Sequence, residues 1–391
     1  MILSPTTESD IVAAISDARA KRTSLAIQGG GTRKNLGRPA QAERTLSLAA
    51  MDGIVFYEPA EMVFCARAGT PVATIEKMLA ERGQMLPFEP MDHRRLYGGA
   101  GAPTIGAVAA CNISGPRRIS HGAARDSLIG LKLVNGAGES IKTGGRVMKN
   151  VTGLDLVKLS SGAFGALGVL TEATFKALPR PETSATLIIR NLDDSRAIAA
   201  LSQALGSPFE VSGAAHLPAG AGAPEARTLL RVENFKSSVD YRLGELRKLV
   251  GGDIVLADDE TRALWRDIGD CAMFAAPDDR AVWRISTAPS RGPDLVRLVQ
   301  KGGAVAHFFD WGGGLIWLAV DAADDAREKD VRAATAACGG HATLVRAPDE
   351  LRARIDVFQP LPEPMMKLSR AIKTSFDPDG ILNPGRMYAG V

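Results

Sequence analysis

Apolar residues in the first half of the chain occur alternately at helical spacing and in the short runs typical of strands. Residues 7–21 carry apolar side chains on one helical face, which predicts a first helix with Thr6 or Thr7 as its N-cap. Pro71 is well placed to open a second helix, because the first N–H groups of a helix have no partner within it. The predicted strands are 24–28, 45–48, 54–57, 63–68, 128–134, 140–143 and 170–178, and the predicted helices are 7–21, 72–82 and 105–111.

The second half follows one order of elements twice. Pro179 and Pro181 mark the boundary between the halves, since the residue before a proline avoids helical conformation. The first unit comprises 186–190, 195–205, 211–217, 228–233, 237–250 and 254–257, and the second comprises 282–286, 293–301, 304–309, 315–320, 326–338 and 342–346. This order, strand–helix–strand–strand–helix–strand, is that of a ferredoxin-like unit. No sequence repeat accompanies it, so the prediction depends on element order.

Composition indicates an ordinary globular protein. The chain has 391 residues, enough for two or three domains, and 45 % of them are apolar. Lys and Arg exceed Asp and Glu by 47 − 44 = 3, and charges of both signs are interspersed. This balance argues against nucleic acid as the main partner.

Cysteine usage and the N-terminal stretch favour a reducing compartment. Cys65, Cys111, Cys271 and Cys338 lie far apart without a C-x-x-C pair, so we expect no iron–sulfur cluster or structural zinc in this chain. The N-terminus lacks the basic start and apolar centre of a signal peptide. No apolar run approaches the roughly 18 residues of a membrane span. We therefore expect a cytoplasmic protein that reaches a membrane only through a partner.

Two glycine-rich segments carry the clearest chemical signal. Residues 28–35 follow a predicted strand, and residues 98–130 contain a second set of glycines. Glycine lets the backbone approach a ligand closely, and successive N–H groups form a nest that binds anions. One such loop alone is as typical of an ordinary surface turn as of a phosphate site. Two of them, flanked by Arg33, Lys34 and the Arg117–Arg118 pair, predict a diphosphate held from two sides.

Other chemistries find little support. Neither loop has the G-x-G-x-x-G pattern of a Rossmann fold, and the glycines of 162–168 have the wrong spacing and precede a predicted strand. The five histidines show no i, i+4 metal spacing, and no G-x-S-x-G elbow occurs. Four arginines lie near the glycine segments: Arg94, Arg95, Arg117 and Arg118. The default interpretation is that all four are solvated, and the alternative is that one of them faces an acid substrate or a partner chain.

Five motifs in order resemble the FAD-binding family of vanillyl-alcohol oxidase and p-cresol methylhydroxylase (PCMH). They are 26–32, 104–110, 122–130, 164–172 and 377–386. Within that family, 114–118 and 144–155 are similar to the FAD-binding subunits of glycolate oxidase (glycolate dehydrogenase). The resemblance covers 1–180 and 355–391 with specific motifs, and is only architectural over 181–354.

The resemblance implies an α+β fold in three parts. Residues 1–180 would form a PCMH-type FAD-binding domain of two subdomains. Residues 181–354 would form a ferredoxin-like α+β cap, and 355–391 a C-terminal segment that returns to the flavin. Thr32 and Arg33 stand where some members attach FAD through a histidine, so FAD is expected to be non-covalent.

The same resemblance implies the site residues. We expect the diphosphate nest at Gln28, Gly29, Gly30, Gly31 and Thr32; a second wall at Thr104, Ile105, Gly106, Gly115, Gly122 and Asp126; backbone contact to the adenine half from Gly168 and Val169; and Asn383 and Arg386 near the flavin ring. Arg386 replaces the lysine usual there and is the one candidate catalytic residue. No metal ligand is expected.

Two functions follow from the resemblance. In the first, the chain helps to oxidise a small 2-hydroxy acid, glycolate to glyoxylate, in a complex with a related flavoprotein subunit and an iron–sulfur subunit that receives electrons from the flavin. In the second, it is a flavin-bound assembly and electron-relay subunit without turnover of its own. Catalytic members carry a histidine pair in the cap, and the comparable stretch 307–317 keeps only His307, which favours the second for the isolated chain. A nicotinamide-driven flavin reductase finds no support. The expected location is the cytoplasm, or the inner membrane surface through partners.

Overall fold

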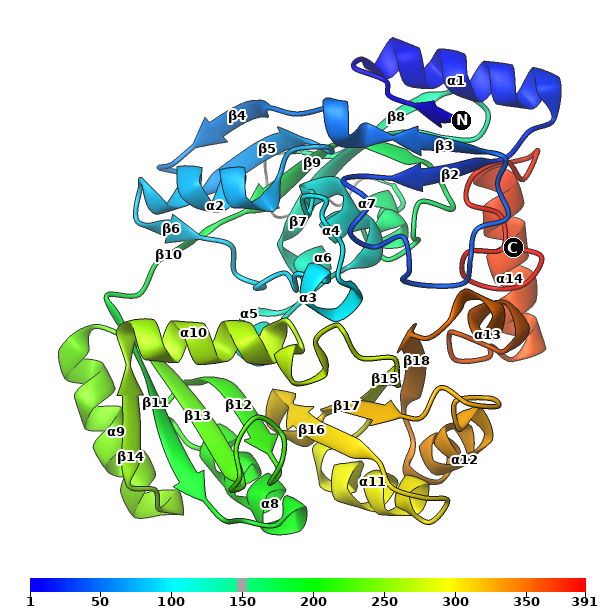
Figure 1. The fold of residues 1–391 in the computed structure, drawn as a ribbon. Coiled ribbons are helices and arrows are strands. Elements are labelled where there is room, and N and C mark those ends of the chain that lie inside the picture. The colour runs from blue at the N-terminus through cyan, green and yellow to red at the C-terminus, as the bar shows by residue number, and fades with distance from the viewer. Residues whose placement is uncertain (146–152) are drawn as a thin grey trace.

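The structure is a computed structural model that describes residues 1–145 and 153–391. The predicted hallmark 144–155 falls partly outside the described residues, since 146–152 are not among them. The described chain forms an N-terminal half built on small sheets and a second half built on one large sheet (Figure 1).

The N-terminal half contains three sheets. A parallel sheet has the order β1-β3-β2, an antiparallel sheet the order β4-β5-β9-β7-β8, and β6 pairs with β10. The elements are β1 (Ile2–Leu3), α1 (Glu8–Lys21), β2 (Leu25–Gln28), β3 (Arg44–Ser47), β4 (Ile54–Glu58), β5 (Val63–Arg67), α2 (Val72–Ala80), β6 (Gln84–Met85), α3 (Arg94–Tyr97), α4 (Ile105–Cys111), α5 (Arg118–His121), α6 (Ala124–Ser127), β7 (Leu128–Val134), β8 (Ser140–Gly144), α7 (Leu156–Ser160), β9 (Val169–Lys176) and β10 (Leu178–Pro179).

Local signals explain why these elements begin where they do. Thr7 caps α1 in a capping box with Asp10, which satisfies N–H groups that the helix leaves unbonded. Pro71 precedes α2, as predicted. The sheets then bury their apolar faces in one core, where Phe64 and Phe175 stack with ring centroids 5.9 Å apart. This core fixes the strands whose ends carry the glycine loops.

The second half, here called the cap, confirms the predicted element order. Its eight-stranded sheet has the order β14-β11-β13-β12-β16-β17-β15-β18. Each run of four is one ferredoxin-like unit, and the units join where His216 of β12 pairs with Phe309 of β16. The elements are β11 (Thr183–Arg190), α8 (Asp194–Leu205), β12 (Val211–Leu217), β13 (Arg227–Asn234), α9 (Lys236–Val250), β14 (Ile254–Ala257), α10 (Asp258–Gly269), β15 (Ala281–Ser286), α11 (Gly292–Gln300), β16 (Ala306–Asp310), β17 (Leu315–Val320), α12 (Glu328–Cys338) and β18 (His341–Arg346).

The two faces of the cap sheet meet different surroundings. Helices α8, α9, α11 and α12 bury one face in an apolar core. Helix α10, which the sequence pattern did not predict, lies between the other face and the N-terminal half (Figure 1). Its Trp265 is buried against Gly213, where a Cβ would lie 2.9 Å from the indole ring. This second face therefore looks toward the N-terminal half.

The C-terminal segment contains two helices that were not predicted, α13 (Asp349–Arg354) and α14 (Glu363–Phe376). After α14 the chain returns to β2, where Leu25 N donates to Ile381 O and Asn383 N donates to Leu25 O. Lys373 of α14 donates to the Asp377 carboxylate and to the carbonyls of Ala166 and Leu382. The tail is thus fixed to the N-terminal half.

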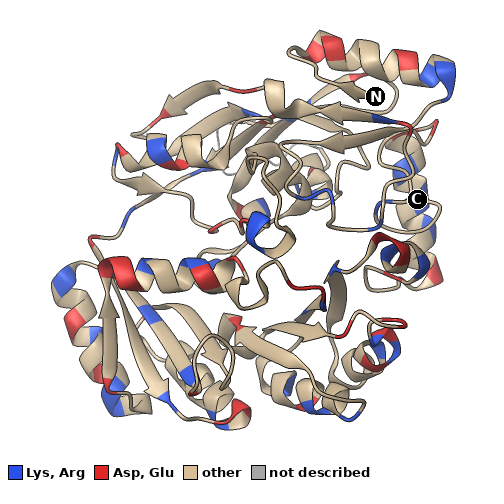
Figure 2. Ribbon diagram, viewed as in Figure 1, with Lys and Arg blue, Asp and Glu red and all other residues tan. Residues whose placement is uncertain are grey.

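Charged groups are spread over both halves with few concentrations of one sign (Figure 2). A network of charged side chains of both signs lies between the two halves. Glu89 accepts two hydrogen bonds from Arg231 of β13, and Arg117 pairs with both Glu89 and Glu233. Among the described residues, no helix combines the length and the apolar content needed to cross a bilayer.

Candidate functional site

A cavity that is open to solvent lies where the first glycine loop, helix α4, residues 164–170 and the C-terminal tail meet. Its lining is Ile27, Gln28, Gly29, Gly30, Gly31, Thr32, Arg33, Lys34, Leu48, Ala68, Gly106, Ala107, Ala110, Cys111, Phe164, Gly165, Gly168, Leu170, Asn383 and Arg386.

Glycine is required in this wall because backbone segments touch. A Cβ on Gly29 would overlap the side chain of Thr104, and one on Gly30 would overlap the carbonyl of Ala102. A Cβ on Gly106, in the first turn of α4, would lie 2.5 Å from the Cβ of Ala68. The two glycine segments are therefore pressed together, which brings both to one side of the cavity.

Backbone donors in this wall are unsatisfied. Within residues 1–145 and 153–391, the N–H groups of 30–33 have no hydrogen-bond acceptor. In the first turn of α4, Ile105 and Gly106 donate to Thr70 O and Ala68 O, whereas the Ala107 N–H makes no such bond. Unpaired N–H groups that line a cavity form an anion nest. Thr104 Oγ1 behind this wall is also buried without a partner.

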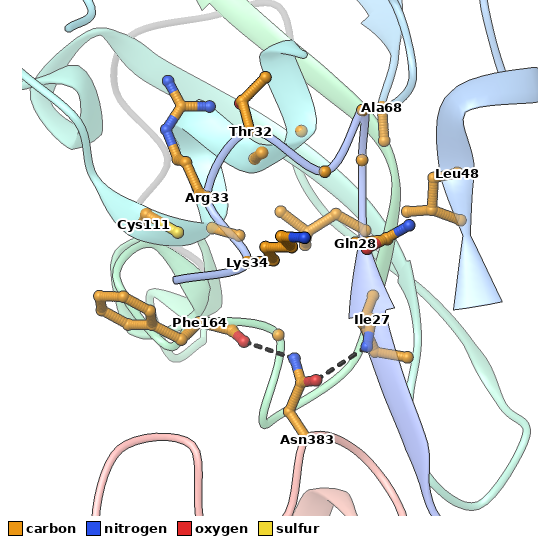
Figure 3. Close-up of a pocket in the computed structure, with 18 of the residues that line it drawn as sticks. Ile27, Gln28, Thr32, Arg33, Lys34, Leu48, Ala68, Cys111, Phe164 and Asn383 are labelled. Atoms are coloured by element: carbon orange, nitrogen blue, oxygen red, sulfur yellow. Dashed lines mark hydrogen bonds between the residues drawn. The ribbon is translucent and has the colours of Figure 1, made fainter. Parts of the chain in front are cut away.

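The two ends of the cavity differ in chemistry. Figure 3 shows Leu48 and Ala68 on one side, and Arg33, Cys111 and Phe164 on the other. The cavity thus combines an apolar slot at Leu48 and Ala68, a nest of N–H donors and the Arg33 cation, groups that suit the rings and the diphosphate of a dinucleotide. The residues present therefore fit a dinucleotide such as FAD.

The structure brings most of the predicted site residues to this cavity. Those that line it are Gln28, Gly29, Gly30, Gly31, Thr32, Gly106, Gly168, Asn383 and Arg386. Thr104 supports the wall from behind, and Ile105 and Val169 are buried in the core. Direct contact of each of these residues with FAD stays a prediction.

Three predicted residues lie outside the cavity lining. Gly115 packs against the carbonyl of Glu89, and its own carbonyl accepts a hydrogen bond of 3.1 Å from Trp311 Nε1 of the cap. Gly122 and Asp126 form a local turn, in which the Asp126 carboxylate accepts from Ala123 N at 2.8 Å. Their geometry accounts for contacts within the protein, and their part in cofactor binding stays a prediction.

Asn383 and Arg386 connect the tail to the wall. Asn383 Oδ1 accepts from Ile27 N at 2.8 Å, and its Nδ2 donates to Phe164 O at 2.7 Å (Figure 3). Arg386 donates from Nη2 to Arg33 O at 2.9 Å and from Nη1 to Arg38 O at 3.3 Å. The terminal nitrogens of Arg386 thus bind backbone carbonyls and hold the first glycine loop.

Arg33 is a lining residue that the sequence flagged as a flanking charge and as standing, with Thr32, where some family members attach FAD. Its side chain is 6 % exposed, and Nη2 donates to Met91 O at 3.0 Å, while Nε and Nη1 have no partner. Burial lowers the pKa of this guanidinium. Cys111 lies nearby, and burial raises the pKa of its thiol, which keeps it neutral. No motif marks Cys111, so the sequence could not single it out.

A second arginine cluster lies between the halves. The guanidinium carbons of Arg118 from α5 and Arg284 from β15 lie 4.7 and 5.0 Å from the ring centroid of Trp311. Burial lowers the pKa of Arg284 to about 10. In the described parts of the chain neither guanidinium has an ion pair. Planar guanidinium groups of this kind suit a carboxylate.

The other arginines considered from sequence are neutralised. Arg94 pairs with Asp92 and Arg95 with Asp267, and Arg117 pairs with Glu89 and Glu233. Arg118 is thus the one of the four left for an acid substrate or a partner.

His307 points away from this region. It shares the helix-covered face of the cap sheet with Phe309, and its Nε2 lies 2.8 Å from Asp194 Oδ2 at the start of α8. His216 Nε2 approaches the other oxygen of Asp194 at 3.3 Å. Over the described ranges, no three His, Cys, Asp or Glu side chains are grouped so as to hold a metal ion.

Comparisons with known proteins agree with this geometry. Residues 1–144 match the family model of the FAD binding domain. The chain is 36 % identical over 377 residues to the glycolate oxidase subunit GlcE of Escherichia coli (strain K12), covering 96 % of this chain and 95 % of that one. It is 28 % identical over 188 residues to the glycolate oxidase subunit GlcD of Bacillus subtilis (strain 168), and that match covers 48 % of this chain and 38 % of GlcD.

Solved structures share the fold. The 4-ethylphenol oxidase from Gulosibacter chungangensis superposes with a TM-score of 0.71 at 16 % identity, covering 99 % of this chain and 89 % of that one. FAD is therefore the cofactor that both sequence and fold indicate for the cavity. Because the resemblance to GlcE extends over nearly the whole of both chains, the chain belongs to the GlcE family of FAD-dependent oxidoreductases, which have a PCMH-type FAD-binding domain.

Proposed function

We propose that the chain is the FAD-binding subunit of a 2-hydroxy acid dehydrogenase complex that oxidises glycolate to glyoxylate. The observation that carries this proposal is the cavity wall of unbonded N–H groups at 30–33, in a chain similar to GlcE over almost its whole length. Bound FAD supplies the electron-accepting chemistry. The wall holds its diphosphate without covalent attachment.

The chain also offers a place for the substrate carboxylate. Arg118 from the N-terminal half and Arg284 from the cap form no ion pair among the described residues, and both contact Trp311. A carboxylate between them would be neutralised and oriented by charge-assisted hydrogen bonds.

The related flavoprotein subunit and the iron–sulfur subunit are the proposed partners. GlcE and GlcD are both named as subunits of glycolate oxidase, which supports an assembly of several chains. In that assembly electrons would leave through the iron–sulfur subunit. We propose a cytoplasmic location, at the inner membrane only through these partners.

A second candidate is an assembly and relay subunit without turnover of its own. It is favoured by His307, which bonds Asp194 on the sheet face remote from the cavity. In this case another subunit would oxidise the substrate.

Anaerobic addition of glycolate tests both candidates. The purified chain should be yellow and should release intact FAD on acid precipitation. If the chain turns over glycolate, its flavin absorbance bleaches without partners. If it is a relay subunit, bleaching requires the co-purified complex. A chain that remains colourless after incubation with FAD would contradict the proposed function itself.

A further inference from the structure

The cavity presents a buried positive charge that has no ion pair among the described residues, although the Asp92 carboxylate acts on it through space. The Arg33 guanidinium belongs to a side chain that is 6 % exposed, and its one hydrogen bond is to the neutral carbonyl of Met91. Nε and Nη1 have no partner, although Arg33 lines the cavity. An unpaired buried charge is costly, so such a group is normally matched by a counter-ion.

The neighbouring groups do not supply that counter-ion. The Asp92 carboxylate is bound by Arg94, which donates to both of its oxygens at 2.6–3.0 Å. Burial raises the pKa of the Tyr97 hydroxyl and of the Cys111 thiol, so both are neutral near pH 7. His93 is neutral as well, because burial and the charge of Arg33 lower its pKa to about 3.

Arg33 and Arg386 have different tasks although both line the cavity. Arg386 uses both terminal nitrogens on the carbonyls of Arg33 and Arg38. It therefore acts on the backbone of the loop. Arg33 keeps Nε and Nη1 free and is the buried cation of the lining that a ligand can pair with, beside the exposed Lys34.

Arg33 lies on the cap-facing side of the cavity. Its Nη2 donates to Met91 O, and the N–H of the adjoining Asp92 donates to Oδ1 of Asp270, which follows α10 in the cap. Arg284 belongs to the cap face that looks toward the N-terminal half. The apolar slot at Leu48 and Ala68 is on the other side of the cavity (Figure 3).

We propose that Arg33 is a positioning residue for the flavin ring of bound FAD, and that its guanidinium compensates the negative charge that the ring gains on reduction. The proposal rests on the function proposed above. It assigns the unpaired cation to the ring because the ring must lie at the cap-facing side, where a substrate on Arg118 and Arg284 could reach it. The diphosphate already has the N–H groups of 30–33. A charge near the reactive nitrogens of a flavin is a known determinant of its electronics.

The midpoint potential of the bound flavin tests this assignment. Arg33→Met should retain FAD within about threefold of the wild-type dissociation constant, and should lower the two-electron potential by at least about 30 mV, a tenfold change in the equilibrium constant. Arg33→Lys keeps the charge and should recover at least half of the shift. Arg82→Met, on the surface, makes the same change in net charge and should leave the potential unchanged.

Other results would overturn the proposal in distinguishable ways. If Arg33→Met raises the dissociation constant of FAD more than tenfold while riboflavin, which lacks the diphosphate, binds as before, the guanidinium serves the diphosphate. If Arg33→Met folds, holds FAD and keeps the wild-type potential, the guanidinium of Arg33 serves neither the diphosphate nor the flavin ring. If Arg33→Met does not fold, Arg33→Lys decides: a potential equal to that of Arg82→Met supports the role of the charge, and one lowered by about 30 mV or more contradicts it. A wild-type chain that takes up no FAD refutes the proposed function and this inference together.

Discussion

At the scale of single residues, the cavity depends on positions where a side chain has no room. Gly30 faces the carbonyl of Ala102, and Gly101 in turn faces the carbonyl of Gly30. The sequence identified the first of these loops because three glycines follow a strand. It could not show which glycines touch another segment, since that contact joins residues far apart along the chain.

Gly30→Ala should lower FAD retention at least tenfold. The added methyl would force the first glycine loop away from residue 102 and displace the N–H groups of the nest. The ratio of flavin to protein absorbance after gel filtration measures retention. Gly99→Ala is the matched control, because a Cβ there meets no atom within 4 Å. Equal flavin occupancy in the two variants would contradict the placement of the nest.

Asp310 makes stability depend on pH. Burial raises its pKa from 3.8 to about 7. Between these values the folded protein keeps a proton that the unfolded chain releases, so the free energy of unfolding falls as pH rises from about 4 to about 7 and then levels. Asp310→Asn removes this dependence. The free energy of unfolding of the variant, relative to that of the wild type, should therefore rise by up to about 4 kcal/mol from pH 4 to pH 7.

Denaturant unfolding at the two ends of this pH range checks the prediction. Asp52→Asn, at an exposed position, serves as the control and should track the wild type. If the Asp310→Asn difference is the same at both pH values, the carboxyl is not protonated in the folded protein.

At the scale of elements, most strands were predictable from their apolar patterns, whereas the helices α10, α13 and α14 were missed. The pattern placed β12, β14 and β17 at their observed bounds, because alternating or continuous apolar runs specify strands strongly. It missed α10, whose buried side chains are few and whose partner surface comes from β11 and β14. It also missed α14, because the prolines before it favour an extended conformation.

The α14 helix shows why the pattern failed there. Lys373 is the one side chain of this helix that is buried, while Met365 and Leu368 are about half exposed. The hydrophobic periodicity of α14 therefore indicates a helix face, that of Met365 and Leu368, which is not buried against the rest of the protein. The contact that fixes the helix is a buried ion pair, and residue type alone does not predict it.

Lys373→Met should destabilise the protein by about 3–5 kcal/mol, because it leaves the fully buried Asp377 carboxylate unpaired. It should also weaken FAD binding, since Lys373 holds the carbonyl of Ala166 beside the cavity. Thermal unfolding with and without added FAD measures both effects. Lys367→Met on the exposed side of α14 is the control. Recovery of stability in the double variant Lys373→Met/Asp377→Asn would confirm that the unpaired carboxylate is the cause.

At the scale of the whole molecule, a buried charge network sets how the cap meets the N-terminal half. Glu89 and Arg117 come from one half, and Arg231 and Glu233 from the other. Arg117 adjoins Arg118, and Trp311 bonds Gly115 two residues earlier, so the network also places the proposed carboxylate anchor. Its members lie too far apart in sequence for any pattern to connect them.

A double-mutant cycle measures this coupling. Glu89→Gln and Arg231→Met should each destabilise the fold, and the pair should show a coupling free energy of about 1–3 kcal/mol. The exposed pair Lys236 and Asp240 should give no more than about 0.5 kcal/mol in the same cycle. Additive effects at Glu89 and Arg231 would mean that this ion pair does not couple the two halves.

The return of the tail to β2 has a consequence for biogenesis. Ile27, at the end of β2, is among the earliest parts of the cavity wall to leave the ribosome, yet its amide N–H is bonded by Asn383. Arg386 likewise braces the loop at Arg33, 353 residues earlier in the chain. The wall of the coenzyme site is therefore completed only once the ribosome has added the segment that holds Asn383 and Arg386.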